Sequence, residues 1–289
     1  MQLIRKEGLG IPGLESRGKV DYLVFPGLAA TGAVRHLFTT RLGGVSKGHL
    51  GSMNVSYTRG DEKENVDENY RRIAEIMDCS TADFVCTHQT HTANIRIVDY
   101  ADAGKGVVCP TDYQDVDGLV TNCKGLVLTA FFADCVPLFF LDPVREVIGL
   151  CHSGWRGTVA GIGGKAVEVM SKHFGCRRED VLAAIGPSIC QDCYEVSEDV
   201  AQRFAEKFRI TGDMGKANHI LKTAEGYGKK GKYLLDLWQA NRQVLLDAGV
   251  LPEHIEVTDL CTCCNSEWLF SHRASEGKRG NLGAFIKLL

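Results

Sequence analysis

The sequence predicts a layered α/β protein with mixed β-sheets, folded as a single domain. Three observations along its 289 residues support this fold class. Short runs rich in β-branched and aromatic residues alternate with amphipathic segments of helical period. Some of these runs follow one another at hairpin spacing and others lead into a helix, which argues against a purely parallel wound sheet. No repeat, low-complexity tract or Pro/Ser-rich linker divides the chain.

The strands are predicted from β-branched and aromatic enrichment bounded by turn residues. Many of the runs are short enough to be strands but too short to be independent helices. In chain order, the predicted strands span residues 21–25, 34–40, 84–89, 94–98, 118–121, 126–132, 136–141, 147–151, 181–185, 255–259 and 284–288.

Four segments have the apolar period of a helix. In residues 62–77, the side chains of Val66, Tyr70, Ile73 and Met77 share one face. Glycines or capping residues bound the others. These further predicted helices span residues 159–174, 198–208 and 233–248.

Composition excludes several classes of protein. With 44% hydrophobic and 24% charged residues and a net charge of -3, the chain can bury a core and is not strongly basic, so no nucleic-acid partner is expected. The longest apolar stretch, residues 126–141, contains polar residues and falls short of the ~20 residues of a membrane helix. The first residues lack the apolar centre of a signal peptide. We therefore expect a cytoplasmic protein with no membrane association.

Twelve cysteines in a chain of 289 residues are too few for a disulfide framework. The groups Cys190-Gln-Asp-Cys193 and Cys261-Thr-Cys263-Cys264 could supply four thiolates to zinc. Zinc ribbons, however, pair such knuckles about 15–20 residues apart, and these two groups are much further apart in the sequence. We therefore expect neither a structural metal nor an obligatory disulfide at these cysteines.

Residues 147–158 indicate a buried strand, a glycine-containing turn and the start of a helix. A helix N-terminus presents unpaired N–H groups and a positive dipole end. The turn from Gly154 to Gly157, with Arg156, is therefore a candidate site for a phosphate or another anion, although a tight structural connection explains the same residues.

Three histidines and one cysteine are candidate catalytic or metal-binding residues. His88 and His91 lie at a strand end, where alternation should turn only one of them inward. Cys135 follows an aspartate inside an apolar double strand, and His152 ends the strand before the glycine turn. A Cys-His-His trio with an open fourth position is a catalytic zinc arrangement. A Cys135–His152 nucleophile pair for acyl or amide chemistry fits the spacing equally well.

A series of motifs resembles the YfiH or laccase-domain family, in that family's order from about residue 35 onward. Together they are far more specific than any one alone. They are Thr39-Thr-Arg41-Leu-Gly43-Gly-Val-Ser46, Asn54-Val-Ser-Tyr-Thr-Arg-Gly60-Asp61, His88-Gln89-Thr-His91, Asp115-Val-Asp117-Gly118, Ala133-Asp134-Cys135-Val-Pro137, His152-Ser-Gly154-Trp155-Arg156-Gly157, Ile185-Gly186-Pro187 and Cys261-Thr-Cys-Cys264-Asn.

The resemblance implies one domain of α/β/β/α layers over residues 1–289, with residues 1–33 as an N-terminal lead-in strand region. The family, historically named for polyphenol oxidation, is viewed as a group of purine nucleoside enzymes. The implied reactions are phosphorolysis of adenosine, inosine and methylthioadenosine to the base and ribose 1-phosphate, and deamination of adenosine. The implied metal is zinc, with copper as the alternative. Its implied ligands, which are also the catalytic residues, are His91, Cys135 and His152.

Purine nucleosides and phosphate are thus the expected partners of a protein expected to be a monomer. We expect nucleoside or phosphate to contact Arg41, Asn54, Arg59 and Arg156, because a planar guanidinium can bridge two phosphate oxygens. Trp155 or Tyr194 could stack on the purine. Asp134 is either an acid/base group or a satisfied buried carboxylate.

Three alternatives remain open at the level of sequence. They are a Cys-His hydrolase acting on peptidoglycan precursors, a copper-dependent polyphenol oxidase and a non-enzymatic zinc-stabilised binding protein. The oxidase is disfavoured because multicopper electron transfer needs several clustered sites, and the nine histidines are mostly scattered.

Overall fold

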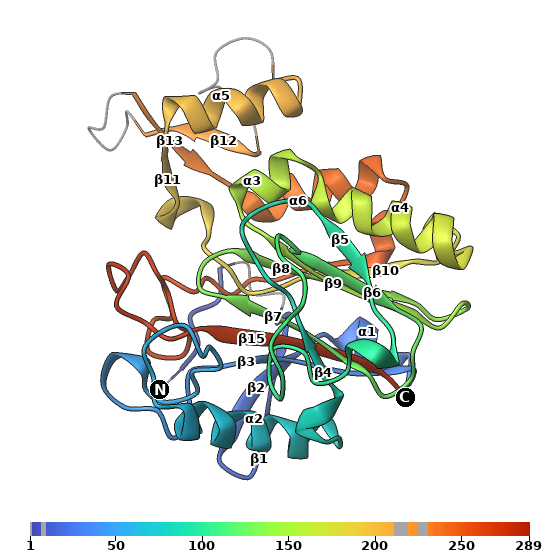
Figure 1. The fold of residues 1–289 in the computed structure, drawn as a ribbon. Helices are drawn as coiled ribbons and strands as arrows, with labels where there is room; N and C mark the ends of the chain where they lie inside the picture. The colour runs from blue at the N-terminus through green and yellow to red at the C-terminus, as the bar shows by residue number, and fades with distance from the viewer. Residues whose placement is uncertain (1, 7–9, 211–218, 225–230) are drawn as a thin grey trace.

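Among the residues that the computed structural model describes (2–6, 10–210, 219–224 and 231–289), two six-stranded sheets stack face to face between helices (Figure 1). This is the α/β/β/α arrangement that was expected. Within the described ranges, no helix has both the length and the apolar composition needed to cross a bilayer.

The first sheet has the strand order β1-β2-β3-β15-β7-β4. Its strands pair antiparallel except β4 and β7, which run parallel. The hairpin of β1 and β2 lies at one edge, within the region expected as a lead-in. The strands are β1 (Gly13–Arg17), β2 (Val20–Val24), β3 (Val34–Thr39), β15 (Leu282–Leu288), β7 (Val127–Phe132) and β4 (Phe84–Cys86).

The second sheet has the order β14-β10-β8-β9-β6-β5 and is mixed. Its central strands pair antiparallel, whereas each edge strand runs parallel to its neighbour. The strands are β14 (Ile255–Val257), β10 (Leu182–Ile185), β8 (Val136–Asp142), β9 (Val147–Ser153), β6 (Gly118–Thr121) and β5 (Ile95–Ile97).

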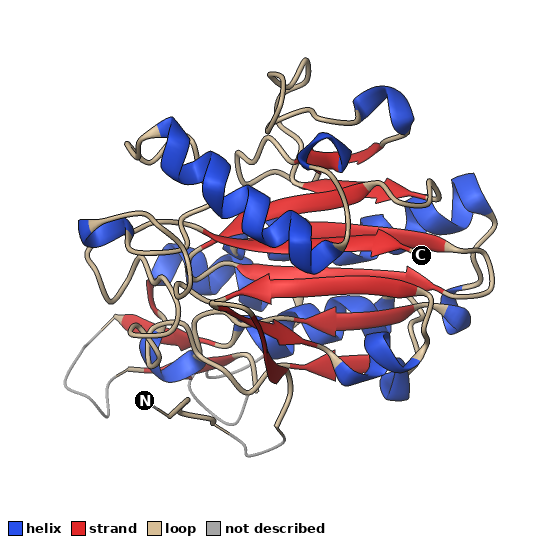
Figure 2. Cartoon of the chain, turned by 90° about the horizontal axis from the view of Figure 1, so that it is seen from below, coloured by secondary structure: helices blue, strands red, loops and turns tan. Residues whose placement is uncertain are grey.

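Three apolar layers hold the sheets and helices together. Both faces of the central strands are buried, so alternate residues enter different layers: Phe139 and Leu141 of β8 lie between the sheets, whereas Leu138 and Phe140 face the helices. Those helices are α4 (Ile162–Phe174) and α6 (Leu237–Asp247). On the opposite side, α2 (Lys63–Met77) crosses the outer face of the first sheet (Figure 2) and buries the predicted apolar face that includes Tyr70.

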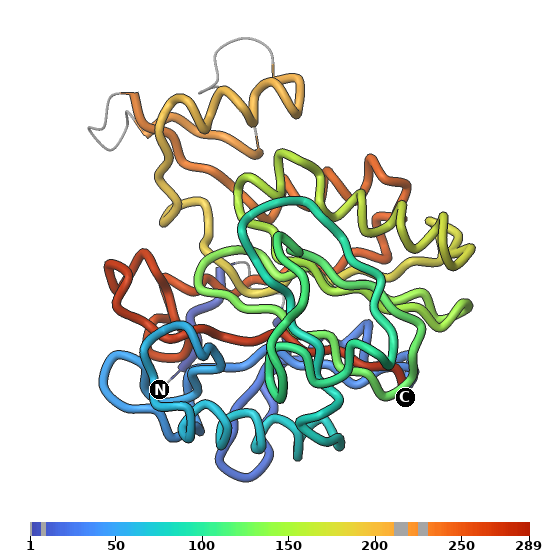
Figure 3. The backbone as a smooth tube through the Cα atoms, in the orientation of Figure 1, coloured from blue at the N-terminus to red at the C-terminus, as the bar shows by residue number. Residues whose placement is uncertain are grey.

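A small lobe projects beside α3 (Trp155–Val159). It contains the three-stranded sheet β11-β13-β12 and α5 (Glu198–Lys207), and Figure 3 traces the chain through it between β10 and α6. The strands of the lobe are β11 (Glu195–Ser197), β13 (Lys232–Leu235) and β12 (Leu221–Thr223).

The eleven predicted strands each overlap an observed one, but two helix predictions were wrong in detail. The helix predicted over 233–248 begins only at Leu237, because Asp236 caps it and residues 232–235 form β13. The helix predicted over 159–174 is α4, which begins only at Ile162, because Gly161, with a φ of +73°, separates it from α3, whose last residue is Val159. The sequence prediction also omitted β1, β11, β12 and the short helix α1 (Pro26–Ala30), which are too short for a clear period.

Candidate metal centre and its cavity

His91, Cys135 and His152 meet where the two sheets are joined. His91 follows β4, Cys135 lies in the turn that takes the chain from β7 in one sheet to β8 in the other, and His152 lies near the end of β9. Their candidate ligand atoms all lie within 4.8 Å of one another. Cys135 Sγ is 3.9 Å from His91 Nε2, and the two imidazole rings are edge to face with centroids 4.9 Å apart.

The backbone around this trio is unusual. His91 and Asp134 have φ angles of +66° and +89°, a region that non-glycine residues seldom occupy. Such conformations persist where the surrounding structure imposes them, and they concentrate at functional sites.

Asp117 connects the two histidines. Its carboxylate accepts hydrogen bonds from the backbone N–H groups of Thr90, His91 and Thr92 at 3.1, 3.1 and 2.8 Å. It also accepts from His152 Nδ1 at 2.8 Å. That bond leaves His152 Nε2 as the ring atom available to a metal, the arrangement by which a carboxylate orients a histidine ligand.

The three side chains differ in exposure and charge. His152 is buried, Cys135 is half-buried and His91 is exposed. Burial alone would raise the pKa of Cys135, but the His152 charge and hydrogen bonds from both imidazoles outweigh it and lower that pKa to about 6. Burial would lower the pKa of His152, but Cys135 and Asp117 raise it to about 9. Without a metal, the pair is therefore thiolate and imidazolium at neutral pH, and a metal ion would displace the imidazolium proton.

Gly154 packs closely against the trio. A Cβ at this position would lie 3.0 Å from His91 Cδ2 and 3.1 Å from Cys135 Sγ. Its φ of -74° is ordinary, so the constraint is the space available and not the backbone conformation.

A cavity of about 460 Å³ opens onto the trio. Its walls combine the three candidate ligands with two arginines, aromatic rings and small polar side chains, and none of the described lining residues is a carboxylate. The lining consists of Ser56, Tyr57, Thr58, Arg59, Cys86, Thr87, His88, Gln89, His91, Gly106, Thr111, Phe131, Phe132, Ala133, Cys135, His152, Arg279 and Asn281.

The candidate phosphate residues are not all placed at this cavity. Arg59 lines it. Arg156 is exposed, lies over the Trp155 ring at 4.3 Å and is outside the lining. The helix that starts at its turn, α3, is five residues long. Trp155 and Tyr194, the aromatic candidates for purine stacking, are also outside the lining, where Tyr57, Phe131 and Phe132 are found instead.

Arg41 and Asn54 are engaged in hydrogen bonds within the protein. Arg41 donates to the carbonyls of Gly51 and Ser266 at 3.0 and 2.8 Å. The buried Asn54 donates to Asp61 and accepts from the N–H of Asn281 at 3.0 Å. Neither residue is in the lining.

Asp134 is a satisfied carboxylate. It accepts a hydrogen bond from the Thr262 hydroxyl at 2.6 Å and another from the Arg273 backbone N–H at 2.7 Å. Each carboxylate oxygen thus has a hydrogen-bond donor, and Asp134 is outside the cavity lining. His88 is exposed and lines the same cavity outside the trio.

Sequence reasoning missed Asp117 as the residue that positions both histidines, and Arg279 as a cavity residue. Arg279 Nε is buried and has no hydrogen-bond partner among the residues that the structure describes, and burial together with the charge of Arg59 lowers the pKa of Arg279 to about 10. The sequence signals for these two residues were weak. Asp117 is marked only by another aspartate two residues before it, and Arg279 only by its place before the last strand. Two like charges beside one cavity favour an anionic ligand.

The expectation that the other cysteines bind no structural metal rested on the separation of the two groups along the chain. Cys190, Cys193, Cys261 and Cys264 form a second group whose sulfurs lie within 4.8 Å of one another. The two pairs are far apart along the chain, but they meet in space because they follow β10 and β14, which are parallel neighbours.

The donor set of the His91–Cys135–His152 group fits a metal ion. Two imidazole nitrogens and one thiolate are ligands that zinc prefers, and three protein ligands leave a position for another ligand. Asp117 provides the outer hydrogen bond that such histidines normally have.

Comparison with known proteins finds relatives that match most of the chain. Residues 35–289 match the family model described as multi-copper polyphenol oxidoreductase laccase. The chain is 39% identical to a Geobacillus stearothermophilus protein named purine nucleoside phosphorylase YlmD, over 88% of this chain and 90% of that protein. It is 36% identical to the Bacillus subtilis protein of the same name, over 86% of each.

Solved structures agree with the sequence comparison. The crystal structure of YlmD from Geobacillus stearothermophilus superposes with a TM-score of 0.84 at 36% identity, covering 96% of this chain and 98% of that one. The Bacillus licheniformis protein YfiH superposes with a TM-score of 0.85 at 34% identity, covering 96% and 99%.

Proposed function

This chain belongs to the multi-copper polyphenol oxidoreductase laccase family. Because its relatives include proteins named purine nucleoside phosphorylase, we propose that it is a zinc-dependent purine nucleoside phosphorylase. Its substrates are adenosine, inosine and methylthioadenosine, each cleaved to the base and the corresponding ribose 1-phosphate. One observation carries the proposal: the cavity combines a Cys-His-His group with two arginines, Arg59 and Arg279, and none of its described lining residues is a carboxylate.

Zinc suits this site better than copper. The ligands proposed are His91, Cys135 and His152, and a zinc ion held by them would supply a Lewis acid beside the cavity. Electron transfer among several coppers needs neighbouring sites rich in histidine. Among the described residues, the other candidate metal group consists of four cysteines.

Arg59 and Arg279 bind the phosphate in this proposal. Arg59 Nη2 donates to the Gly277 carbonyl at 2.9 Å, which holds the guanidinium at the cavity wall, and Arg279 lines the same cavity, with no partner for its Nε among the described residues. The phosphate oxygen forms a bond to ribose C1′ while the bond from C1′ to purine N9 breaks and its electron pair leaves with the base. The adjacent dianion stabilises the positive charge that develops on the ribose.

The purine needs a contact surface and a proton. Phe131, Phe132 and Tyr57 provide apolar wall to the cavity. His88 is the lining imidazole outside the trio, and we assign it the delivery of a proton to the departing base.

Deamination of adenosine is proposed as a second reaction of the same cavity, with water in place of phosphate. The observation that favours it is a metal-ligand set of three, which leaves a position open. His88 would again transfer the proton, because Asp134 is engaged by Thr262 and Arg273.

The compartment proposed is a reducing cytoplasm, in which cysteine thiols stay reduced. We propose that the protein acts as a monomer on purine nucleosides and phosphate.

The test is hypoxanthine release from inosine by protein of defined zinc content, with and without phosphate. We expect release to require phosphate and to be lost in Cys135→Ala, whereas Cys123→Ala, which removes a half-buried thiol elsewhere, keeps it. Release that is independent of phosphate would contradict phosphorolysis, and turnover of a peptidoglycan precursor or a polyphenol in its place would support the alternative enzymes. Absence of all turnover with a zinc ion bound would indicate a binding protein.

A further inference from the structure

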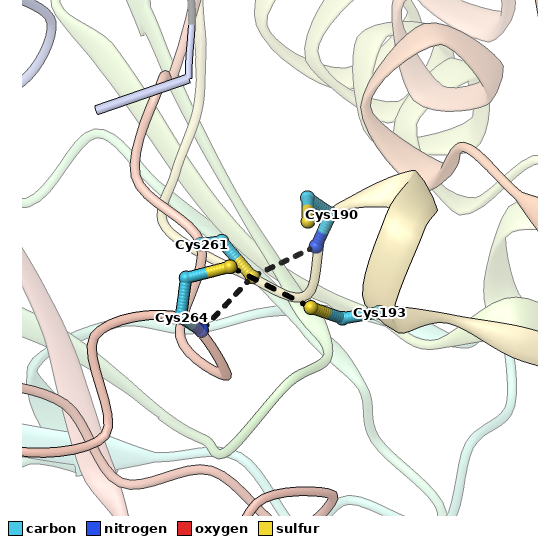
Figure 4. A group of neighbouring side chains, drawn as sticks. All are labelled: Cys190, Cys193, Cys261 and Cys264. Carbon is cyan, nitrogen blue, oxygen red and sulfur yellow. Dashed lines mark hydrogen bonds between the residues drawn. The ribbon is translucent and has the colours of Figure 1, made fainter. Parts of the chain in front are cut away.

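The second cysteine group is built by two loops at one edge of the second sheet. Cys190 and Cys193 follow β10, and Cys261 and Cys264 follow β14. Because β10 and β14 run parallel, their carboxyl ends open at the same edge, and a parallel bridge between Ser188 and Cys261 keeps the two loops side by side. Figure 4 shows the four sulfurs facing one another across the gap between the loops.

The dimensions of the group match one metal ion. Four thiolates bound to zinc at ~2.3 Å lie about 3.8 Å apart, at the corners of a tetrahedron. Here all four sulfurs lie within 4.8 Å of one another, and Cys193 Sγ is 3.5 Å from Cys264 Sγ. An iron–sulfur cluster places several irons and sulfides between its cysteines and therefore needs a wider group.

The surroundings are those of a metal thiolate centre. The backbone N–H groups of Cys190 and Cys264 point at Cys261 Sγ, at 3.2 and 3.4 Å. Such N–H donors stabilise negative charge on a ligating sulfur. Each pair has the two-residue spacing of a zinc knuckle.

We propose that Cys190, Cys193, Cys261 and Cys264 bind one structural zinc ion as a closed tetrathiolate centre, separate from the His91–Cys135–His152 site. Zinc displaces the thiol protons to solvent as it binds, with no change of oxidation state. The four protein ligands leave no position for substrate, so the centre is structural. It does not depend on which reaction the cavity performs.

The centre would stabilise the turn that carries Cys135. The two loops are joined by a hydrogen bond from Thr262 N–H to the Ser188 carbonyl at 3.1 Å. The first loop donates from Ile189 N–H to the Asp134 carbonyl at 3.0 Å, and the second donates from the Thr262 hydroxyl to the Asp134 carboxylate. A zinc ion that holds the loops together thus supports Asp134 from both sides, next to the candidate ligand Cys135.

The experiment measures zinc content and zinc X-ray absorption in the full-length Cys135→Ala variant, in which the trio is broken but all four other cysteines remain. We expect one tightly bound zinc per chain, surrounded by four sulfurs at ~2.3 Å. Loss of all zinc from Cys135→Ala, a zinc environment containing nitrogen or oxygen, or a disulfide between Cys193 and Cys264 in the purified protein would overturn the proposal.

Substitutions at the centre provide the second measurement. Adding Cys264→Ser to Cys135→Ala should remove the remaining zinc, whereas adding Cys263→Ser, the neighbouring thiol outside the group, should leave it in place. If the Cys264→Ser protein does not fold, the X-ray absorption of Cys135→Ala alone decides. The absence of phosphorolysis in any of these proteins would bear on the proposed function and not on this centre.

Discussion

Asp117 is the side chain on which the geometry of the candidate site depends. It bonds the backbone on both sides of His91 and the Nδ1 atom of His152, so one carboxylate orients two proposed ligands. Burial would raise its pKa, but the hydrogen bonds from His152 and the Thr90–Thr92 backbone hold it near 2. It therefore carries its charge at every pH at which the protein would work.

Asp117→Asn should weaken zinc binding at the trio about 10- to 100-fold, because an amide cannot accept the same bonds from His152 and three N–H groups. Zinc affinity at the trio is measured by competition with a chelator, under conditions that leave zinc bound at the four-cysteine centre in place. Asp115→Asn is the matched control, since Asp115 lies in the same loop and is exposed. Equal affinities in the two variants would mean that Asp117 does not position the ligands.

Gly154→Ala should lower kcat/KM between about tenfold and a hundredfold, because its Cβ displaces His91 and Cys135. Gly164→Ala in α4 is the control: its Cβ would meet no atom closer than 3.6 Å, and the substitution should be neutral or stabilising. Steady-state kinetics and thermal unfolding of both variants separate the two effects. Full activity in Gly154→Ala would show that the trio does not need its present spacing.

At the scale of elements, the cavity arises from loops that the sheets bring together. Arg59 comes from the loop before α2 and Arg279 from the segment before β15, and Arg59 Nε donates to the Arg279 carbonyl at 3.3 Å. Arg156 lies beyond the end of β9, in α3, and faces solvent.

Arg279→Ala should raise the KM for phosphate about 10- to 100-fold, the value of one or two charge-assisted hydrogen bonds. Inosine turnover is followed at a series of phosphate concentrations. Arg156→Ala is compared in the same assay and should have little effect. A larger effect of Arg156→Ala than of Arg279→Ala would indicate that the phosphate binds at the turn at the start of α3 instead.

Strand positions were predictable because apolar and β-branched runs record which residues are buried. The three candidate metal ligands could be identified from the sequence because each lies in a compact motif. Contacts between different motifs could not be predicted, because they depend on strand pairing between distant segments. Examples are the hydrogen bonds of Asp117, the position of Arg279 at the cavity and the proximity of Cys190 to Cys261. Local period also favoured a helix at Tyr233, where pairing with β11 and β12 makes a strand.

At the scale of the molecule, the two sheets share one apolar layer, and we propose that residues 1–289 form one domain around it. His36 of β3 is buried beside this layer, against the rings of Phe25 and Phe139, and its Nε2 accepts the Phe25 N–H at 2.8 Å. Burial lowers the pKa of His36 to about 4, so the folded protein keeps it neutral.

Unfolding free energy should therefore fall by about 3 kcal/mol from His36 alone as the pH drops from about 6.5 to 4. In that window the unfolded chain binds a proton that the folded chain does not, so acid favours unfolding. Denaturant unfolding at several pH values, in wild type and His36→Gln, isolates this contribution. A variant with the same pH dependence as wild type would contradict it.

We propose that the cavity beside His91, Cys135 and His152 transfers ribose from a purine nucleoside to phosphate. Phosphorus NMR of the zinc-loaded protein with inosine and inorganic phosphate tests it directly, since the product is a phosphate ester. Ribose 1-phosphate should accumulate in step with hypoxanthine, and neither should form with His152→Ala. Hypoxanthine released with free ribose and unchanged inorganic phosphate would contradict it.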